Sequence, residues 1–583
     1  MIYKKKTQNI IYIVLGVFLL SVILLIGRSV RLQQNKVLCS ALADEKLSYE
    51  QFELAVCDVT EANAPIYHKS WLDENTGIHY LFLPSKESGK EWFWMFTGGE
   101  MGIDAFSIDD KKISVGDRFK CEAGDYDVSL FVGDELFYTI SLSVRFLSDQ
   151  PTMYIETDSG VVDYLHESKE NYEAGRYSLV SEDGSLAYTG ELETIRCRGN
   201  VSYTETDKKS YQMKLSEKAD FFHMGADRQW LLLANSFDRT LLKNKLAYEM
   251  ANGMGLEFTP EVQHVDLFMN GEYMGNYLLS EKVEVDDYRV KISNLEKQNE
   301  MMNPEVLLSE FGQFVTDPDY LYSKKGFFIP NNPTDITGGY LLELELSDRY
   351  GLEASGFLTS RMQAVVISNP EYASEEQVNY ISNLYQEFEN AIFEEDGYCK
   401  ESGKYYLEYI DLESFASKYL LEETIKNLDA SATSQYLYKY PDSVSSLLYA
   451  GPAWDYDKAF GVSGVTEDGI EMNNPVGLYA AHKTKDSDIW YGLYQHDDFK
   501  EKVADTYFSV LQPKLTEVLK DDVYQWSTEL EQSAICNSIK WNSWKECTTD
   551  EERKDAYYGE IDKVVNFLVE RQKFLTDELA EYK

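Results

Sequence analysis

The chain has 583 residues, of which 44% are hydrophobic and 14% aromatic. This is enough apolar material for about three folded domains, and it argues against wholesale disorder. The 55 basic residues are outnumbered by 100 acidic residues, which gives a formal net charge of −45. Nucleic acid is therefore excluded as a partner, because its binding depends on Lys and Arg side chains that neutralise phosphates. The acidity is spread along the chain, as is typical of a solvated surface that resists aggregation.

The N-terminal residues predict a membrane anchor. Residues 1–9 are basic, and residues 10–27 are uncharged and almost wholly apolar. This apolar stretch is near the short end of what a bilayer requires. No small-residue cleavage site precedes Arg28, so an uncleaved transmembrane helix is favoured over a signal peptide. The basic cluster places the N-terminus in the cytoplasm, and we expect a single-pass membrane protein whose bulk is extracytoplasmic.

Two further segments precede the main domain. Residues 28–75 show no clean period and are interpreted as a stalk. Residues 76–147 contain short strand-like runs separated by Gly and Asp, which is typical of a small β-sandwich domain. The seven cysteines contain no CxxC pair, so a cysteine-based zinc site is not supported. Cys536 and Cys547 could pair across a short loop in an oxidising compartment, or they could be ordinary buried thiols.

Residues 148–583 predict an α+β domain with two lobes. The part from about 150 to 345 is mixed, and the part from about 346 to 583 is mainly helical in pattern. Within the first part, the stretch "VQHVDLFMNGEYMGNYLLSEKVEV" (262–285) predicts a hairpin with an Asn-Gly turn. The preceding stretch, "RTLLKNKLAYEMANGMG", spaces apolar residues four apart and ends at glycine, which predicts a packed helix.

A basic segment is the first candidate for chemistry. The stretch "RCRGNVSY…DKKSYQMKL" brings Arg198, Lys209 and Lys214 into an otherwise acidic protein. Arg and Lys both suit the oxygens of an anionic ligand such as a phosphate. The alternative is a basic edge strand that discourages aggregation.

Two isolated carboxylates are further candidates, although a single carboxylate is a less specific indication of a functional site. Glu281 lies at the exit of the predicted hairpin, and most residues of that hairpin are expected to be core. Asp429 follows a helical stretch, in a small polar loop before the strand-like "QYLYKY". A carboxylate in such a loop can act as a general base, or it can cap the next turn.

The segment "GPAWDYDKAFG" is the strongest candidate. If it is extended, Asp455 and Asp457 point to the same side. Two neighbouring carboxylates suit Mg²⁺, which is held by one or two carboxylates together with substrate phosphates. The alternative is a pair satisfied by backbone donors and Lys458. Protein kinases follow the same chain order of a basic strand, a loop aspartate and a metal-binding aspartate.

Together, the stretches "IRCRGNVSY", "KKSYQMKL", "GGYLLELE", "NLDASATSQYLYKY" and "GPAWDYDKAFG" resemble the CotH (spore-coat protein H) kinase family. The resemblance covers about 150–575. It implies an atypical two-lobed protein-kinase-like domain that lacks the usual Gly-rich loop. It also implies the use of ATP with Mg²⁺ or Mn²⁺, and phosphorylation of serines on protein substrates of the spore coat or cell surface.

The resemblance also implies roles for single residues. Asp429 would be the catalytic aspartate, and Asp455 and Asp457 would form the metal site. Arg198, Lys209 and Lys214 would face the phosphates, and Glu281 would lie at the exit to the hinge between the lobes. The chain departs from kinases at Ser434 and Gln435, where an Asn would be a second metal ligand.

Two other functions are compatible with the sequence. The Ser434/Gln435 departure and the sandwich domain favour a catalytically silent kinase-like protein that binds or scaffolds at the surface. A hydrolase acting on cell-wall glycans through Asp429 and one of the later aspartates is the third hypothesis.

Overall fold

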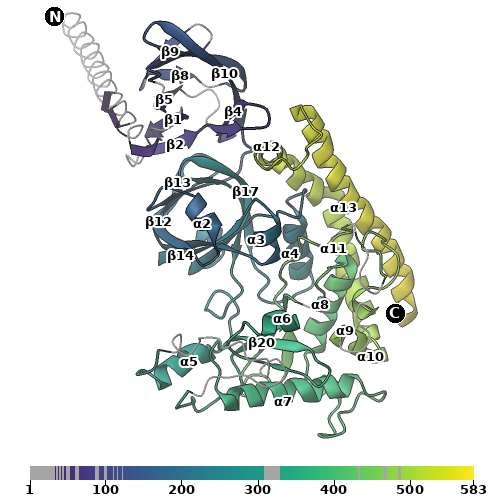
Figure 1. Ribbon diagram of the computed structural model, residues 1–583. Helices are drawn as coiled ribbons and strands as arrows, with labels where there is room; N and C mark the ends of the chain where they lie inside the picture. Colours follow the sequence, from purple (N-terminus) through teal and green to yellow (C-terminus); the bar gives the residue numbers. More distant parts are fainter. Residues whose placement is uncertain are drawn as a thin grey trace, which may run out of the picture.

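The computed structural model describes residues 53–59, 65–85, 91–97, 102–108, 111–114, 116–120, 122–307, 329–430, 433–462, 464, 469–482 and 488–583, with short pieces between 33 and 47. A β-sandwich, a β-barrel and a helix-rich lobe follow one another (Figure 1). The predicted transmembrane helix at 10–27 lies outside the described residues. Within the described ranges, no helix has the length and apolar character that a membrane span needs.

The first domain is a sandwich of two sheets. One sheet has the order β2 (Pro65–Lys69), β1 (Glu53–Val59), β5 (Glu91–Thr97) and β8 (Arg118–Lys120). The other has the order β3 (Trp71–Asp73), β4 (Ile78–Leu83), β10 (Glu135–Phe146), β9 (Gly124–Val132), β6 (Ala105–Ile108) and β7 (Lys111–Ile113). Residues of both sheets, including Trp92, Trp94 and Phe106, form one apolar core. Strands β1, β2 and β3 lie in the range that the sequence assigned to a stalk, so the sheets begin earlier than expected.

The second domain, the barrel, comprises residues 152–281. Its closed order is β11 (Thr152–Thr157), β12 (Tyr172–Val180), β13 (Leu186–Arg198), β14 (Ser210–Ala219), β15 (Asp227–Leu233), β17 (Glu272–Glu281) and β16 (Val262–Met269). β16 and β17 form the predicted hairpin, and Asn270 and Gly271 both have positive φ, as the favoured turn requires. Tyr211, Met213 and Leu215 alternate along β14 and fill the interior.

The third domain, the helical lobe, comprises residues 340–579. Its sheet has the order β19 (Gly356–Leu358), β20 (Ala364–Asn369), β18 (Tyr340–Glu345), β21 (Gln435–Lys439) and β22 (Leu448–Ala450). The helices around it include α7 (Glu375–Ile392) and α8 (Leu412–Ile425). Strand β18 lies within the range assigned to the first lobe, but it pairs with β20 and β21 and therefore belongs to the second.

Two sets of contacts join the domains. Helix α4 (Lys243–Gly253), which follows β15, shares one core with the helical lobe through Leu246 and Met250. Helix α12 (Val523–Trp541) closes a second cluster, in which Phe82 of the sandwich, Phe268 of the barrel and Ile535 of α12 are all buried.

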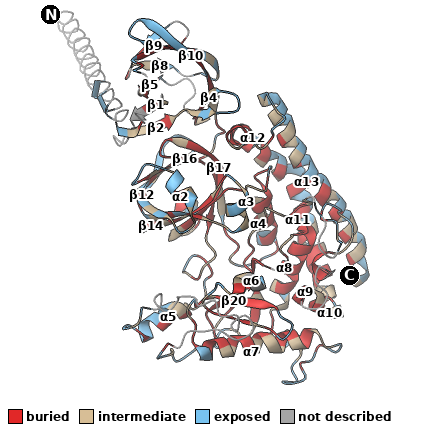
Figure 2. Ribbon diagram, viewed as in Figure 1, coloured by how far each residue is buried: buried red, intermediate tan, exposed pale blue. Residues whose placement is uncertain are grey.

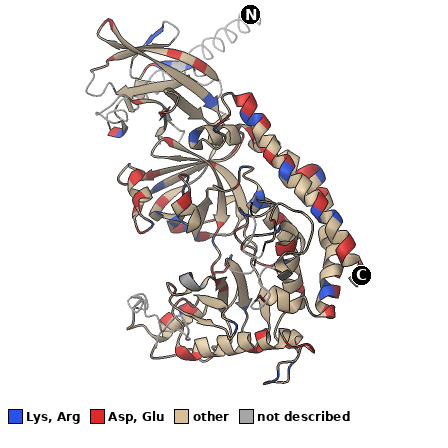
Figure 3. Cartoon of the chain, turned by 45° about the vertical axis from the view of Figure 1, so that its right-hand side comes forward, with Lys and Arg blue, Asp and Glu red and all other residues tan. Residues whose placement is uncertain are grey.

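The long helix α13 (Asp550–Leu579) runs along the side of the molecule. Buried residues concentrate in α8 and in the barrel strands, whereas the outward face of α13 is exposed (Figure 2). Acidic and basic residues are interspersed along α13, and acidic residues are spread over all three domains (Figure 3).

Candidate functional site

The segment that carries Asp455 and Asp457 is a loop and not an extended strand. Asp455 has φ of 66°, in the left-handed region. The loop is held at both ends, because the Gly451 N–H donates to the carbonyl of Tyr436 on β21 (2.9 Å) and the Phe460 N–H donates to the carbonyl of Ile425 on α8 (2.7 Å). The two aspartates are therefore placed by the sheet and helix of the lobe rather than by strand alternation.

Asp457 lies in a negatively charged environment. Burial and the charges of Asp455 and Asp238 raise its pKa to about 8, whereas Lys458 and Lys243 act in the opposite direction. Lys243 donates instead to the Asp457 backbone carbonyl, at 3.4 Å. A bound cation would offset the charges of the neighbouring carboxylates.

Arg198 reaches this loop from the barrel. Its guanidinium lies 5.4 Å from the ring centre of Trp454, at the end of β13. Burial is the main cause of the high pKa values of Tyr248 and Tyr436. The charge of Asp455 raises both pKa values further, and the charge of Arg198 lowers both. The cation of one lobe and the carboxylate of the other therefore act on the same two hydroxyls. In the described part of the chain, Arg198 has no carboxylate ion-pair partner.

Glu343 is a neighbouring carboxylate that the sequence analysis missed. It stands opposite Tyr436 in the β18–β21 register. Burial and the charge of Glu345 raise its pKa to about 8, Asp455 adds to this, and a hydrogen bond from Tyr436 acts against it. The sequence signal was the alternation in "YLLELE", which places Glu343 and Glu345 on one face of the strand; that this face is covered follows only from the tertiary structure.

The donor set is suited to a cation shared with a ligand. Among the residues that the structure describes, no group of three or more His, Cys, Asp or Glu side chains is arranged to hold a metal ion. The protein therefore offers the Asp455–Asp457 pair and leaves other coordination positions to a ligand. Mg²⁺ is commonly held in this way, by one or two carboxylates and phosphate oxygens.

The loop that follows α8 leads from Asp429 to this pair. The Asp429 N–H donates to Asn427 Oδ1 at 3.3 Å, and the Asp429 charge contributes to the raised pKa of Tyr479. The loop ends at Ser434, whose hydroxyl donates to Asp455 Oδ2 at 3.4 Å. The residue that contacts Asp455 thus follows Asp429 by five positions in the chain.

The departure at 434–435 has a clear geometry. Ser434, one of the two residues found where the kinase chain order leads us to expect an Asn, lies beside Asp455. Gln435 stands opposite Leu344 in the sheet register, one residue out of phase with Tyr436, so its side chain lies on the other face of the sheet. Of the two residues, only Ser434 contacts the carboxylates.

A family comparison covers the segments that carry these residues. The family model described as CotH kinase protein matches residues 195–575. The chain belongs to the CotH kinase family. No curated protein matches the chain. The match includes the end of β13, the Asp429 loop and the Asp455–Asp457 loop, so membership identifies a kinase-like protein with a domain of mixed α and β content.

The two predicted lysines of the CotH kinase domain lie away from the pair. Lys209 donates to the backbone carbonyls of Tyr203 (2.6 Å) and Thr206 (2.5 Å). Lys214 is partly exposed on the outer face of the barrel, where it pairs with Glu193. Both ammonium groups are engaged locally, so the expectation that they face the phosphates is not supported by their contacts, and of the predicted basic residues Arg198 alone is brought to Asp455.

The contacts of Glu281 are those of a residue with a structural role. It forms an ion pair with buried Arg289 at 2.5 Å and accepts a hydrogen bond from the Glu261 N–H at 2.8 Å. Burial raises its pKa to about 7, although Arg289 lowers it. Glu281 thus fixes the end of β17, where the chain leaves the barrel for the helical lobe, and has no contact with the aspartate pair.

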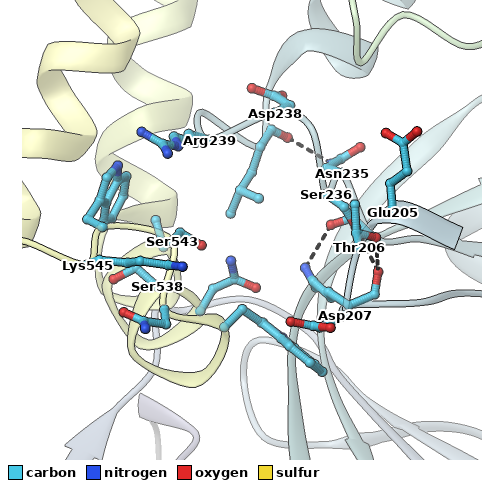
Figure 4. A pocket seen from close by; sticks show the side chains of 18 of the residues that line it. Glu205, Thr206, Asp207, Asn235, Ser236, Asp238, Arg239, Ser538, Ser543 and Lys545 are labelled. Carbon is cyan, nitrogen blue, oxygen red and sulfur yellow. Dashed lines mark hydrogen bonds between the residues drawn. The ribbon is translucent and has the colours of Figure 1, made fainter. Parts of the chain in front are cut away.

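A cavity of about 490 Å³ lies between the barrel and the end of α12. Asp238 and Arg239 line one side of it, and Lys545 and Ser538 line another (Figure 4). Asp238 also raises the pKa of Asp457. One residue that lines the cavity, Asp238, therefore acts on the aspartate pair, but neither Asp455 nor Asp457 lines it.

Proposed function

We propose that this CotH kinase family member transfers the γ-phosphoryl group of ATP to serine hydroxyls of protein substrates at the cell surface or spore coat. The observation that supports it most is the contact of Arg198 from the barrel with Trp454 of the helical lobe, the residue that precedes Asp455. A cation opposite a carboxylate pair is the arrangement that a nucleotide–metal complex requires.

Asp455 and Asp457 are the residues that would hold Mg²⁺ or Mn²⁺. Burial and the charges of Asp455 and Asp238 raise the pKa of Asp457, which supports the proposal that a cation binds the pair. When bound, a divalent cation would supply positive charge and orient phosphate oxygens. Ser434 is placed to hold Asp455 in orientation through its hydroxyl.

Asp429 and Arg198 carry the remaining roles. Asp429 accepts the proton of the substrate serine hydroxyl while the serine oxygen forms the new bond to the γ-phosphorus. The bond from that phosphorus to the β–γ bridging oxygen breaks, and ADP leaves. Arg198 donates to phosphate oxygens and stabilises the charge that develops on them. Positioning by the two lobes supplies most of the rate enhancement.

The location outside the membrane is part of this proposal. Residues 10–27 have the composition of an anchor. Cys57, which is buried in β1, is disulfide-bonded, and structural disulfides persist in oxidising compartments. Cys536 and Cys547, the pair considered from the sequence, are both free thiols.

A catalytically silent kinase-like binding or scaffold protein is the second candidate, and the departure from the kinase pattern at Ser434 and Gln435 favours it. Calorimetric titration of the full chain in detergent with ATP, with and without Mn²⁺, separates the two functions. For the kinase we expect ATP binding that depends on Mn²⁺ and is lost in Asp455→Asn. Absence of binding contradicts the kinase and favours the silent protein, and so does binding without phosphoryl transfer.

A further inference from the structure

One buried carboxylate contacts both loops of the candidate site. Glu422 lies on α8 with no solvent exposure. Its Oε1 accepts a hydrogen bond from the Tyr456 hydroxyl at 2.9 Å, and its Oε2 accepts one from Asn427 Nδ2 at 2.8 Å. Tyr456 lies between Asp455 and Asp457 in the chain, and Asn427 precedes Asp429 by two residues. The two oxygens of Glu422 therefore join the metal-site loop to the catalytic loop.

The charge of Glu422 is balanced beside it. Lys418, one turn earlier on α8, lies 2.8 Å from the Glu422 carboxylate and donates to the Tyr456 hydroxyl at 2.7 Å. Both side chains of the ion pair are fully buried. A buried ion pair of this kind contributes little net stability compared with apolar residues, because desolvation offsets the attraction. Its physical effect is to specify geometry, since removal of any partner leaves a buried polar group unpaired.

Asn427 and Tyr456, two of the partners of Glu422, are also tied to the backbone of the two loops. The Asp429 N–H donates to Asn427 Oδ1 at 3.3 Å, so the amide of Asn427 contacts Glu422 with one end and the catalytic loop with the other. The Tyr456 N–H donates to Asn244 Oδ1 of α4 at 2.7 Å. The chain between Asp455 and Asp457 is thus fixed from α8 on one side and from α4 on the other.

From these contacts we infer that Glu422 is a positioning residue that sets the separation between the proton-accepting Asp429 and the Asp455–Asp457 pair. The inference rests on the proposed function for the roles of the aspartates. Phosphoryl transfer needs both groups placed at once, and a displacement of about 1 Å can cost about a hundredfold in rate. Glu422 itself contacts neither substrate nor cation.

Tyr456→Phe tests the connection with minimal change in volume. The matched control is Tyr273→Phe, because the Tyr273 hydroxyl also donates to a fully buried carboxylate, that of Asp266 in the barrel, at 3.2 Å. Below the melting temperature of every variant, we expect Tyr456→Phe to lower kcat at least about tenfold, with less than about a twofold change in the KM for ATP. Tyr273→Phe is expected to keep the wild-type kcat. Equal kcat values for the two variants would overturn the inference.

A double-mutant cycle tests whether the two loops act through Glu422. Tyr456→Phe and Asn427→Ala each remove one of its contacts. Because both act on one carboxylate, the loss of kcat in the double variant is expected to be smaller than the product of the single losses. Independent, multiplicative losses would contradict the inference while leaving the proposed function intact.

Hydrogen exchange provides a readout that needs no activity. Mn²⁺ added to the wild-type full chain is expected to slow exchange in residues 452–460 and also in 425–430, and Tyr456→Phe is expected to lose the second effect. If Mn²⁺ does not bind to the wild type, the proposed function fails. Exchange of 425–430 in the metal-free variants then decides the inference alone: faster exchange in Tyr456→Phe than in Tyr273→Phe supports it, and equal exchange contradicts it.

Discussion

The guanidinium of Arg198 lies over the ring of Trp454, 5.4 Å from its centre. This contact joins the last residue of β13 to the residue that precedes Asp455. It brings a cation of the barrel to the acidic loop of the helical lobe, and a phosphate chain between the lobes would be contacted from both sides.

Replacement of Arg198 is therefore expected to weaken phosphoryl transfer. Arg198→Ala removes a hydrogen-bonding cation from the phosphate position, and loss of such a group typically costs about a hundredfold in rate. Arg196→Ala is the matched control, because Arg196 is exposed two residues earlier on the same strand and contacts Gln212. Lys214→Ala is expected to behave like that control, since Lys214 pairs with Glu193. Steady-state kinetics with ATP as the varied substrate measure these effects.

Asp457→Asn is expected to separate stability from metal binding. Because the pKa of Asp457 is raised to about 8, its carboxylate must take up a proton on folding near pH 7 when no metal is bound. Asn is neutral already, so the variant without metal should melt at the wild-type temperature or above it. The rise in melting temperature that Mn²⁺ gives to the wild type is expected to disappear. Thermal melts with and without Mn²⁺ measure both effects. A Mn²⁺-dependent rise that persists in the variant would show that Asp457 does not bind the cation.

Glu281 gives a prediction about pH and stability. Its pKa is raised from 4.5 to about 7 in the folded protein, so folding favours the protonated form. The stabilisation from this group is present below pH 4.5 and is lost as the pH rises through 7. Glu281→Gln stays neutral, so its stability relative to the wild type is expected to increase between pH 4.5 and 7. Denaturant unfolding at several pH values measures this difference, and a constant difference would contradict the assignment.

The interface between the sandwich and the barrel is expected to contribute to stability alone. Phe82 is 1% exposed and packs against Tyr273, with 4.8 Å between the ring centres. Phe82→Ala is expected to lower the free energy of unfolding by about 3–5 kcal/mol. Phe137→Ala, at a position in the same domain that is 52% exposed, is the control with little effect. Transfer rates measured on the folded variants should match the wild type, and a large loss of rate in Phe82→Ala would place the sandwich in the active site.

Local patterns in the sequence predicted the elements whose determinants are local. Asn270 and Gly271 supply the positive φ values of the β16–β17 turn, and Leu246 and Met250 mark the buried face of α4. The stretch around Asp429 was correctly expected to be a loop between a helix and a strand. The chain order of these pieces also led to the family.

The features of the site that depend on tertiary packing could not be predicted in the same way. Asp455 adopts a left-handed conformation within a loop fixed by β21 and α8, which strand alternation did not anticipate. Strand alternation alone does not show that Glu343 is buried, and its burial together with the charges of Glu345 and Asp455 makes its environment unfavourable for charge. Lys209 and Lys214 belong to a basic segment whose composition is typical of a phosphate site, but their partners come from the barrel itself.

Phosphoryl transfer by the full chain is the most direct test of the central claim. The reaction combines γ-labelled ATP, Mg²⁺ or Mn²⁺ and a serine-containing protein acceptor, and it compares the wild type with Asp429→Asn, Asp455→Asn and Arg196→Ala. Metal-dependent labelling of serine is expected for the wild type and Arg196→Ala, and a loss of at least about a hundredfold is expected for the two aspartate variants. Equal labelling by the wild type and both aspartate variants, or no labelling by the wild type, would contradict the claim.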